Sequence, residues 1–388
     1  MAAAYSAQAE DRRARGGDGQ EPVATFELFV RRLPADRAYL IACGLEQALT
    51  YLKELRFTPE EIEYLKGIPV MGHVHPDFWE RLRTLRFTGE LWAMPEGTRF
   101  YANQPILRVT APLIEAQIVE TTLLAIVGFQ TMVASKAARV VDAAQGKPVL
   151  EMGARHAHGT EAALYAARAA HMGGCVSTSN TEAGMRFGIP LAGTMAHSFV
   201  MAQAEGEAGE AQAFTDFCAL FPDHATLLLD TYDTLAGLER VIERGLRPQA
   251  VRLDSGDMLA LSLRVRARLD AAGMQEVKIV ATGDLDEYII AELVEAEAPI
   301  DVFGVGTAIT TSKDHPYLGV VYKLVHIEGE GIAPGTEGRA KRSLEKATAP
   351  GRKQVYRTTD AKGNRVRDTV IVEGMPEPEG KKLLVRVL

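Results

Sequence analysis

A histidine between two hydroxyl side chains is the first candidate for chemistry in this sequence. Thr194, His197 and Ser198 follow the apolar run Gly188–Ala192 and lead into a helical pattern. Where a strand is followed by a helix, polar side chains and free backbone N–H groups lie together at the junction. Imidazole changes charge near neutral pH and can act as a nucleophile. The residues alone allow either a reactive His197 or a structural histidine that is hydrogen-bonded near a helix start.

A glycine-rich stretch near the end of the periodic part of the chain predicts a phosphate site. Gly304, Gly306 and Thr307 offer close approach to the backbone and one hydroxyl group, before a helix start. The stretch follows the last expected strand, where α/β barrels often bind phosphate. A glycine-rich turn without a ligand is the alternative interpretation.

Carboxylates and one arginine complete the set of candidate groups. Asp254 and Asp257 follow one apolar run, and Gly283 and Asp284 follow the next. Such carboxylates accept hydrogen bonds from sugar hydroxyls or hold a metal ion through water. Arg155 is suited to a two-pronged pair with a planar carboxylate. A phosphate site, carboxylates for sugar hydroxyls, an arginine for a carboxylate and a reactive histidine stand together. They indicate a site that brings a phosphorylated sugar and an acid together.

The pair His156 and His158 could also be read as metal ligands. No carboxylate stands at helical spacing to serve as a third ligand. We therefore expect these imidazoles to be supporting or structural groups.

An alternation of strands and helices must position these groups. Seven short β-like runs, mostly separated by helical stretches, are Pro148–Met152, Gly174–Ser177, Ile189–Gly193, Ala225–Asp230, Ala250–Asp254, Val277–Gly283 and Asp301–Gly306. This pattern predicts an incomplete or irregular α/β barrel of about seven parallel strands, with a doubly wound open sheet as the alternative. The polar residues fall at the carboxyl ends of the strands, where α/β barrels place their active sites.

Length, net charge and cysteine content predict the domain organisation, the kinds of partner and the location of the protein. The 388 residues predict an N-terminal α/β domain (1–112), the barrel (113–326) and a C-terminal β-rich segment (327–388). A net charge of −8 argues against a nucleic-acid partner. We also expect no membrane segment, because no apolar run approaches the roughly 20 residues that span a bilayer. Three scattered cysteines are typical of a cytoplasmic protein.

One stretch departs from this acidic balance. Arg339–Arg357 holds seven basic residues against one acidic residue. It is interpreted either as the solvated face of a hairpin or as a basic wall that attracts an anionic ligand.

Six stretches together resemble the nicotinate phosphoribosyltransferase family. They are Phe26–Pro34, Met152–Arg155, Gly193–Ser198, Arg252–Asp257, Phe303–Thr307 and Lys346–Lys353. The resemblance runs from about Met1 to the C-terminus, and the combination is far more specific than any single motif. The family is similar in fold to the nicotinamide and quinolinate enzymes.

The resemblance implies a reaction in which nicotinate and phosphoribosyl pyrophosphate give nicotinate mononucleotide and pyrophosphate. It further implies ATP hydrolysis through a phosphohistidine at His197, Mg²⁺ at the pyrophosphate, and a homodimer with shared active sites. Arg155, Thr194 and Arg252 would face nicotinate, with Ser198 and Asp257 as further substrate-binding residues. Asp254, Gly283 and Asp284 would hold ribose, Asp254 as a catalytic carboxylate, and Gly304, Gly306 and Thr307 the 5′-phosphate.

The choice of pyridine is expected to depend on Arg155 and Asn180. In relatives that use nicotinamide, an Asp near the position of Asn180 accepts from the amide and would repel a carboxylate. A neutral Asn180 beside Arg155 favours the acid, unless Asn180 only caps the following helix. A nicotinamide-using enzyme and a sugar-phosphate-binding barrel without turnover are the alternatives. Family members begin with a segment whose Tyr stacks on the pyridine, and we expect that segment to precede Met1.

Overall fold

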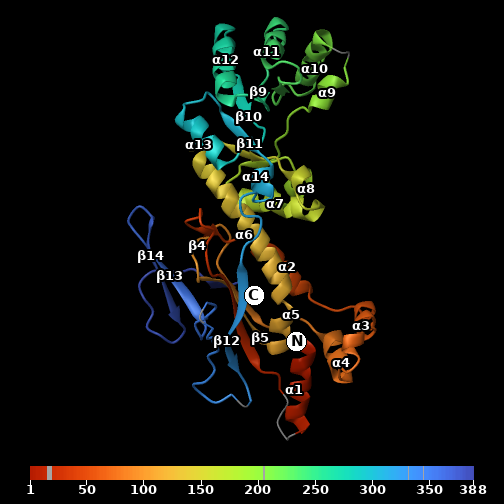
Figure 1. The fold of residues 1–388 in the computed structure, drawn as a ribbon, viewed down its shortest axis with the longest axis vertical. Helices are drawn as coiled ribbons and strands as arrows, with labels where there is room; N and C mark the ends of the chain where they lie inside the picture. The colour runs from red at the N-terminus through yellow and green to blue at the C-terminus, as the bar shows by residue number, and fades with distance from the viewer. Residues whose placement is uncertain (15–19, 204–205, 331, 344) are drawn as a thin grey trace. The chain divides into compact units, whose positions relative to one another are not determined.

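The chain folds into two compact units, each described here by itself. Figure 1 shows the fold in a computed structural model, which describes residues 1–14, 20–203, 206–330, 332–343 and 345–388. The first unit comprises Met1–Thr131 and Tyr317–Leu388, and the second comprises Met132–Pro316. The three-part division at residues 112 and 326 stays a prediction.

An antiparallel sheet forms the centre of the first unit. Its strand order is β12–β1–β5–β3–β16, with bounds Val320–Glu328, Val23–Val30, Pro105–Pro112, Glu90–Ala93 and Val385–Arg386. Seven of the eight residues of β1 are buried, so this strand lies in the middle of the core. A second sheet has the order β14–β13–β15, with bounds Arg365–Val372, Lys353–Thr359 and Lys381–Lys382, and β2 (Leu40–Ile41) pairs with β4 (Arg99–Phe100).

The helices that precede α6 in this unit are, among the described residues, α1 (Ala2–Ala14), α2 (Leu45–Glu54), α3 (Pro59–Lys66), α4 (Pro76–Thr84) and α5 (Leu113–Ile118), with a 3₁₀ turn at Pro69–Met71. The start of α3 follows its sequence signal. The Thr58 hydroxyl accepts from the Glu61 N–H at 3.2 Å, and the Glu61 carboxylate accepts from the Thr58 N–H at 2.7 Å. This capping box, with Pro59 at the first helical position, fixes where the helix begins.

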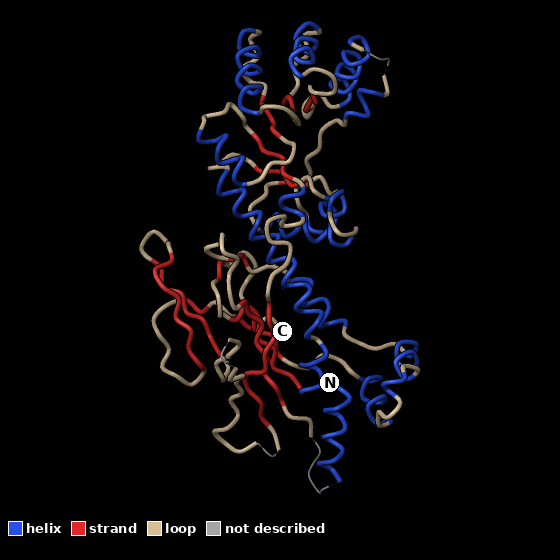
Figure 2. Tube along the Cα trace, viewed as in Figure 1, coloured by secondary structure: helices blue, strands red, loops and turns tan. Residues whose placement is uncertain are grey.

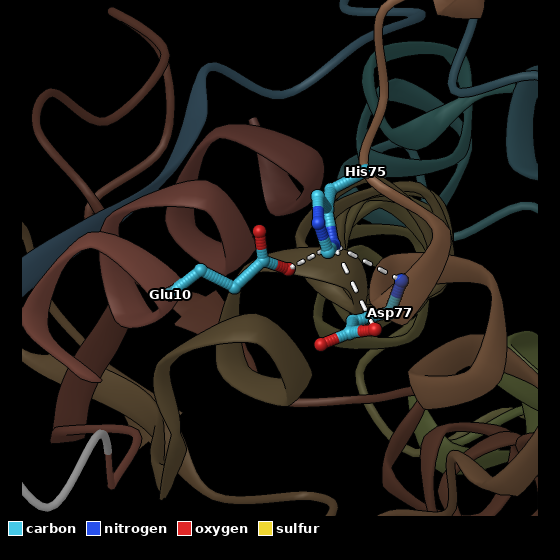
Figure 3. Close-up of side chains that lie close together, drawn as sticks. All are labelled: Glu10, His75 and Asp77. Atoms are coloured by element: carbon cyan, nitrogen blue, oxygen red, sulfur yellow. Dashed lines mark hydrogen bonds and ion pairs between the residues drawn. The ribbon is translucent and has the colours of Figure 1, made fainter. Parts of the chain in front are cut away.

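Three side chains join α1 to the start of α4 (Figure 3). The imidazole of His75 caps α4, because its Nδ1 accepts from the Asp77 N–H at 3.3 Å. The same nitrogen lies 3.0 Å from Glu10 Oε1 and 3.7 Å from Asp77 Oδ1. An unprotonated Nδ1 caps α4, whereas a protonated one would pair with Glu10 on α1, so the cap and the link to α1 are alternatives.

The basic stretch Arg339–Arg357 belongs to the first unit, and several of its cations are paired there. Lys353 Nζ lies 2.8 Å from Glu27 Oε2, a carboxylate that is fully buried. Arg357 lies 2.8 Å from Asp368. These partners are internal, so these two cations belong neither to a solvated face nor to a wall that is free to attract an anion.

Helix α6 (Glu120–Ala143) is the longest helix among the described residues. It is long and apolar enough to cross a membrane by length and composition alone. However, 72% of its most apolar window is buried inside the protein, as in a core helix.

A curled sheet of six parallel strands forms the second unit. The order is β7–β6–β11–β10–β9–β8, with bounds Ser177–Thr178, Val149–Glu151, Val302–Val305, Lys278–Ala281, Ala250–Leu253 and Thr226–Leu228. Its helices, blue around the red strands in Figure 2, are α7 (Thr160–Met172), α8 (Thr181–Phe187), α9 (His197–Met201), α10 (Glu207–Leu220), α11 (Thr234–Glu243), α12 (Met258–Ala271), α13 (Glu287–Glu295) and α14 (Thr307–Thr310), with a 3₁₀ turn at Ala154–His156. The α/β half-barrel predicted from the alternation is present.

The seventh expected strand is reduced to one bridge. Of the stretch Ile189–Gly193, only Leu191 pairs, and its partner is Thr178, the last residue of the edge strand β7. The Pro190 carbonyl accepts from Thr178 N–H and Ala192 N–H donates to the Thr178 carbonyl, both at 3.0 Å. Pro190 itself has no N–H, so the ladder cannot continue. In the described part of the chain the barrel therefore has six strands rather than seven.

Candidate active site

The carboxyl ends of the parallel strands surround two adjoining cavities, of about 460 and 690 Å³. Both cavities are lined by Met152, Arg155, Ser179, Arg252 and Asp254, so together they form one cleft, called here the strand-tip cleft. The smaller cavity also meets Gly283, Asp284, Gly304, Gly306 and Thr307. The larger one meets Thr194, His197 and Ser198.

Arg252 is the central residue of the cleft. It stands on β9, and each of its three nitrogens donates to a different partner. Nη1 donates to the Thr194 hydroxyl at 2.7 Å, Nε to the Thr282 hydroxyl at 2.7 Å, and Nη2 to Asp254 Oδ1 at 2.6 Å. The planar guanidinium fixes all three directions at once. It therefore ties the Thr194 segment to the ends of β9 and β10.

The environment of Asp254 keeps its carboxyl group charged. Burial by itself would raise the pKa of Asp254, but the hydrogen bond from Thr282 and the charge of Arg252 outweigh that effect. The pKa of Asp254 therefore lies below its ordinary value. The cleft thus presents a carboxylate that stays ionised at any physiological pH.

His197 is the first residue of α9 and faces that carboxylate. Its Nδ1 is hydrogen-bonded to the Thr231 hydroxyl at 3.2 Å, and its Nε2 lies 3.7 Å from Asp254 Oδ2. The side chain is 41% exposed, so the ring is anchored on one side and accessible from the cleft. An imidazole held in this way can take up a proton or an electrophile while a carboxylate balances the positive charge.

The glycine-rich stretch forms the end of β11 and the start of α14. A Cβ at Gly304 would lie 2.6 Å from Thr282 Cγ2 and 2.7 Å from Met152 Sδ, so only glycine fits there. The hydroxyl of Thr307 is hydrogen-bonded to Nδ1 of His156. His156, which the sequence suggested as a supporting group, therefore lines the cleft directly.

The turn after β10 depends on an unusual backbone conformation. Gly283 and Asp284 have φ values of 87° and 47°. A Cβ at Gly283 would lie only 1.8 Å from the carbonyl oxygen of Asp254. Glycine is thus required by both the close approach and the positive φ, and it sets the distance between two strand ends.

Two of the expected binding residues have structural partners outside the cleft. Asn180 Oδ1 accepts from the Ala183 N–H at 3.1 Å and caps α8, while its neighbours Ser179 and Thr181 line the cavities. Asp257 Oδ1 accepts from the Ala260 N–H at 3.0 Å and caps α12. Asp257 lines a third cavity, of about 520 Å³, which shares Asp254, Gly283 and Asp284 with the smaller cavity of the cleft.

Sequence reasoning missed two residues of the cleft. Thr282 bonds both Arg252 and Asp254, and Ser179 lines both cavities. Each directly adjoins a predicted residue at a strand end, Gly283 and Asn180. That adjacency is the signal that could have found them.

The comparisons agree with this architecture. Residues 16–128 match the model of the nicotinate phosphoribosyltransferase (NAPRTase) N-terminal domain, and residues 148–358 match the NAPRTase family. Nicotinate phosphoribosyltransferase pncB2 of Mycobacterium tuberculosis is 46% identical over 94% of this chain and 76% of its own length. The Bacillus subtilis nicotinate phosphoribosyltransferase is 46% identical over 87% of this chain and 68% of its own.

Solved structures show the same fold. The crystal structure of human nicotinic acid phosphoribosyltransferase superposes with a TM-score of 0.81 at 28% identity, covering 100% of this chain and 88% of the human one. The nicotinate-nucleotide pyrophosphorylase of Pyrococcus furiosus gives 0.74 at 24% identity, covering 99% and 87%, which supports the fold alone.

Fold and cleft together define an α/β half-barrel whose candidate site lies at the carboxyl ends of parallel strands, and the named relatives make it an enzyme of the glycosyltransferase type. Within that class, the chain belongs to the nicotinate phosphoribosyltransferase family, whose members act in NAD biosynthesis.

Proposed function

We propose that this chain forms nicotinate mononucleotide and pyrophosphate from nicotinate and phosphoribosyl pyrophosphate, with ATP hydrolysis coupled through a phosphohistidine at His197. The observation that carries the proposal is the strand-tip cleft itself. It joins a glycine-rich loop, a charged carboxylate and an accessible histidine around one arginine, Arg252. We place this reaction in the cytoplasm.

The cleft suggests how the substrates divide it. Gly304, Gly306 and Thr307 receive the 5′-phosphate, because their backbone is approachable and Thr307 adds a hydroxyl. Asp254 and Asp284 face the ribose, where positive charge develops in the transition state and a carboxylate stabilises it. Arg155 binds the carboxylate of nicotinate from one side. Arg252, with its hydrogen-bond partner Thr194, binds it from the other.

ATP coupling is assigned to the side of the cleft where His197 lies. With Nδ1 held by Thr231, Nε2 is the nitrogen left to accept a phosphoryl group. Asp254 at 3.7 Å balances the charge of the ring during the transfer. Ser198, next in the chain, lines the same cavity and binds the transferred phosphate.

An acidic residue that follows β8 offers a ligand atom for Mg²⁺. Asp230, beyond the end of β8, accepts from the Ser255 hydroxyl through Oδ2, while its Oδ1 is buried and has no hydrogen-bond partner among the described residues. Carboxylate oxygens are the ligands that Mg²⁺ prefers. Asp230 would offer that oxygen to the ion, which when bound would neutralise the charge of pyrophosphate.

The resemblance to the family also supports a homodimer with shared active sites, and the division of the chain into segments 1–112, 113–326 and 327–388. Sedimentation would test the assembly: a fully active monomer would contradict it.

The test of the function is incubation with nicotinate, phosphoribosyl pyrophosphate and ATP labelled at the γ-phosphate, followed by product analysis. We expect nicotinate mononucleotide, pyrophosphate and an acid-labile label on the protein. His197→Ala should abolish the label, whereas His73→Ala, at an exposed histidine of the first unit, should retain it. Preferential use of nicotinamide, or binding without turnover, would contradict the proposal, and label on the His197 variant would refute the phosphohistidine.

A further inference from the structure

A buried carboxylate lies beneath the strand-tip cleft and takes no part in the chemistry proposed above. Glu151 is the last residue of β6 and is 1% exposed. Its Oε2 accepts from the Thr178 hydroxyl at 2.6 Å. Its Oε1 accepts from the Gly153 N–H at 2.5 Å and from the Thr310 hydroxyl at 3.0 Å. Among the described residues no cation pairs with it, so these three donors alone stabilise the group.

Each donor belongs to a different wall of the cleft. Gly153 begins the turn that carries Arg155, and Thr310 ends α14, whose first residue is Thr307. The Thr178 hydroxyl, besides donating to Glu151, accepts from the Asn180 N–H at 3.0 Å. One carboxylate is thus connected to both the proposed pyridine side and the proposed phosphate side.

The packing around Gly153 leaves the connected segments little room to move. A Cβ at Gly153 would lie 1.9 Å from Thr310 Oγ1 and 2.7 Å from the Gly306 carbonyl oxygen. The Arg155 turn and α14 are therefore in direct contact, and a shift in one displaces the other. Hydrogen bonds to a buried charged group are among the strong ones, and losing one leaves an unsatisfied charge.

We propose that Glu151 is a positioning residue that couples the two halves of the cleft. It holds the Gly153–Arg155 turn, the Thr178–Asn180 turn and α14 in one fixed arrangement, so that the pyridine and the sugar phosphate are presented to each other correctly. The assignment of the halves to substrates rests on the proposed function. The coupling itself rests only on the hydrogen bonds.

Two substitutions cut the connections one at a time. Thr178→Val removes the hydroxyl on the pyridine side, and Thr310→Val removes the one on the phosphate side, each with nearly unchanged volume. We expect Thr178→Val to raise the KM for nicotinate about tenfold with a smaller change for phosphoribosyl pyrophosphate, and Thr310→Val to do the reverse. Glu151→Gln should raise both. The serine variants, which keep the hydroxyl, should restore the wild-type values.

Amide hydrogen exchange gives a second measurement that needs no turnover. If Glu151 couples the walls, Thr310→Val accelerates exchange in segment 178–182 as well as in 306–311, and Thr178→Val does the converse. Thr226→Val, at a buried threonine of β8, is the matched control and should loosen neither segment.

The outcomes separate the two ideas. A wild-type enzyme that makes no mononucleotide from nicotinate defeats the proposed function, while the exchange measurement still decides the coupling. Exchange that accelerates only in the segment next to each substitution overturns the coupling. Normal KM values for both substrates in Glu151→Gln, with only a lower melting temperature, also overturn it, because Glu151 would then serve stability alone.

Discussion

Asn180 caps a helix, and its part in the choice of pyridine is a proposal that one substitution can test. Its oxygen caps α8 through the Ala183 N–H. Aspartate caps helices about as well as asparagine, so Asn180→Asp adds a charge next to the cleft without disturbing the helix. The variant is therefore a clean electrostatic test.

We expect Asn180→Asp to lower kcat/KM for nicotinate about tenfold relative to nicotinamide, because a carboxylate repels the acid and not the amide. Steady-state kinetics with both pyridines on wild type and variant measure the ratio. An unchanged ratio removes Asn180 from the specificity argument and leaves Arg155 alone.

Asp254 gives a prediction about pH. Burial raises the pKa of Asp254, but Thr282 and Arg252 lower it by more than burial raises it. The pKa is therefore lower in the folded protein than in the unfolded chain. A depressed carboxyl pKa stabilises the fold above the unfolded value, and the stabilisation is lost as pH falls through the lower folded pKa. We therefore expect Asp254→Asn to lower the melting temperature at pH 7 and the deficit to shrink below about pH 4.

The control for this experiment is Asp257→Asn. Asp257 caps α12 through the Ala260 N–H, a role that asparagine fills. A deficit for Asp254→Asn that stays constant between pH 7 and pH 3 would contradict the proposed electrostatic origin.

Single residues also show what the sequence could predict. Arg155, His197 and Asp254 could be singled out because each follows an apolar run and carries a side chain with evident chemistry, and the structure places all three on the cleft. Thr282 and Ser179 were missed, because a hydroxyl becomes important only through the partners that folding brings to it. Glu151 is the same case: its three donors come from three separate segments.

At the scale of elements, the turn after β10 is the most constrained. Gly283 combines a φ of 87° with an approach that leaves no room for a Cβ. We expect Gly283→Ala to destabilise the protein by about 2–4 kcal/mol and to lower activity at least tenfold, because β9 and β10 must separate at their ends.

Gly245→Ala is the matched control. Gly245 follows α11 with a φ of 63°, but a Cβ there meets nothing within 4 Å. It should cost only about 1–2 kcal/mol, the price of the backbone conformation, and leave kcat unchanged. Urea unfolding and initial rates measure both variants. Equal losses would mean that the close approach to Asp254 does not matter.

The elements were predictable to the extent that their signals are local. The alternation of strands and helices gave the parallel sheet, and Thr58 with Pro59 gave the start of α3. The stretch Ile189–Gly193 is as apolar as a strand, yet only Leu191 pairs. Strand pairing needs a backbone donor and acceptor on each strand, and Pro190 has no N–H to donate.

For the whole molecule, the cysteines offer a simple test of packing. Cys43 and Cys175 are buried, and burial raises the pKa of the Cys175 thiol strongly, with the charge of Glu151 adding to it. Cys218 is partly exposed, and its partial burial also raises the pKa of its thiol. Because the thiolate is the reactive form, both effects slow reaction at buried sites.

We expect a thiol reagent to modify Cys218 alone in the native protein, and all three cysteines after denaturation. Mass spectrometry of the modified peptides identifies the sites, and Cys218→Ser should leave the native protein unreactive. Rapid modification of Cys175 without denaturant would contradict its burial in the native protein.

The strand order of the half-barrel has a consequence for how the chain finds its structure. β8, β9, β10 and β11 pair with their neighbours in sequence, so they can assemble through local contacts. The pairing of β11 with β6 is different, since it closes a loop that contains every other strand of the sheet. Closing such a loop costs chain entropy before any contact repays it. The β6–β11 contacts should therefore form late in folding, and weakening them should hasten unfolding more than it slows folding.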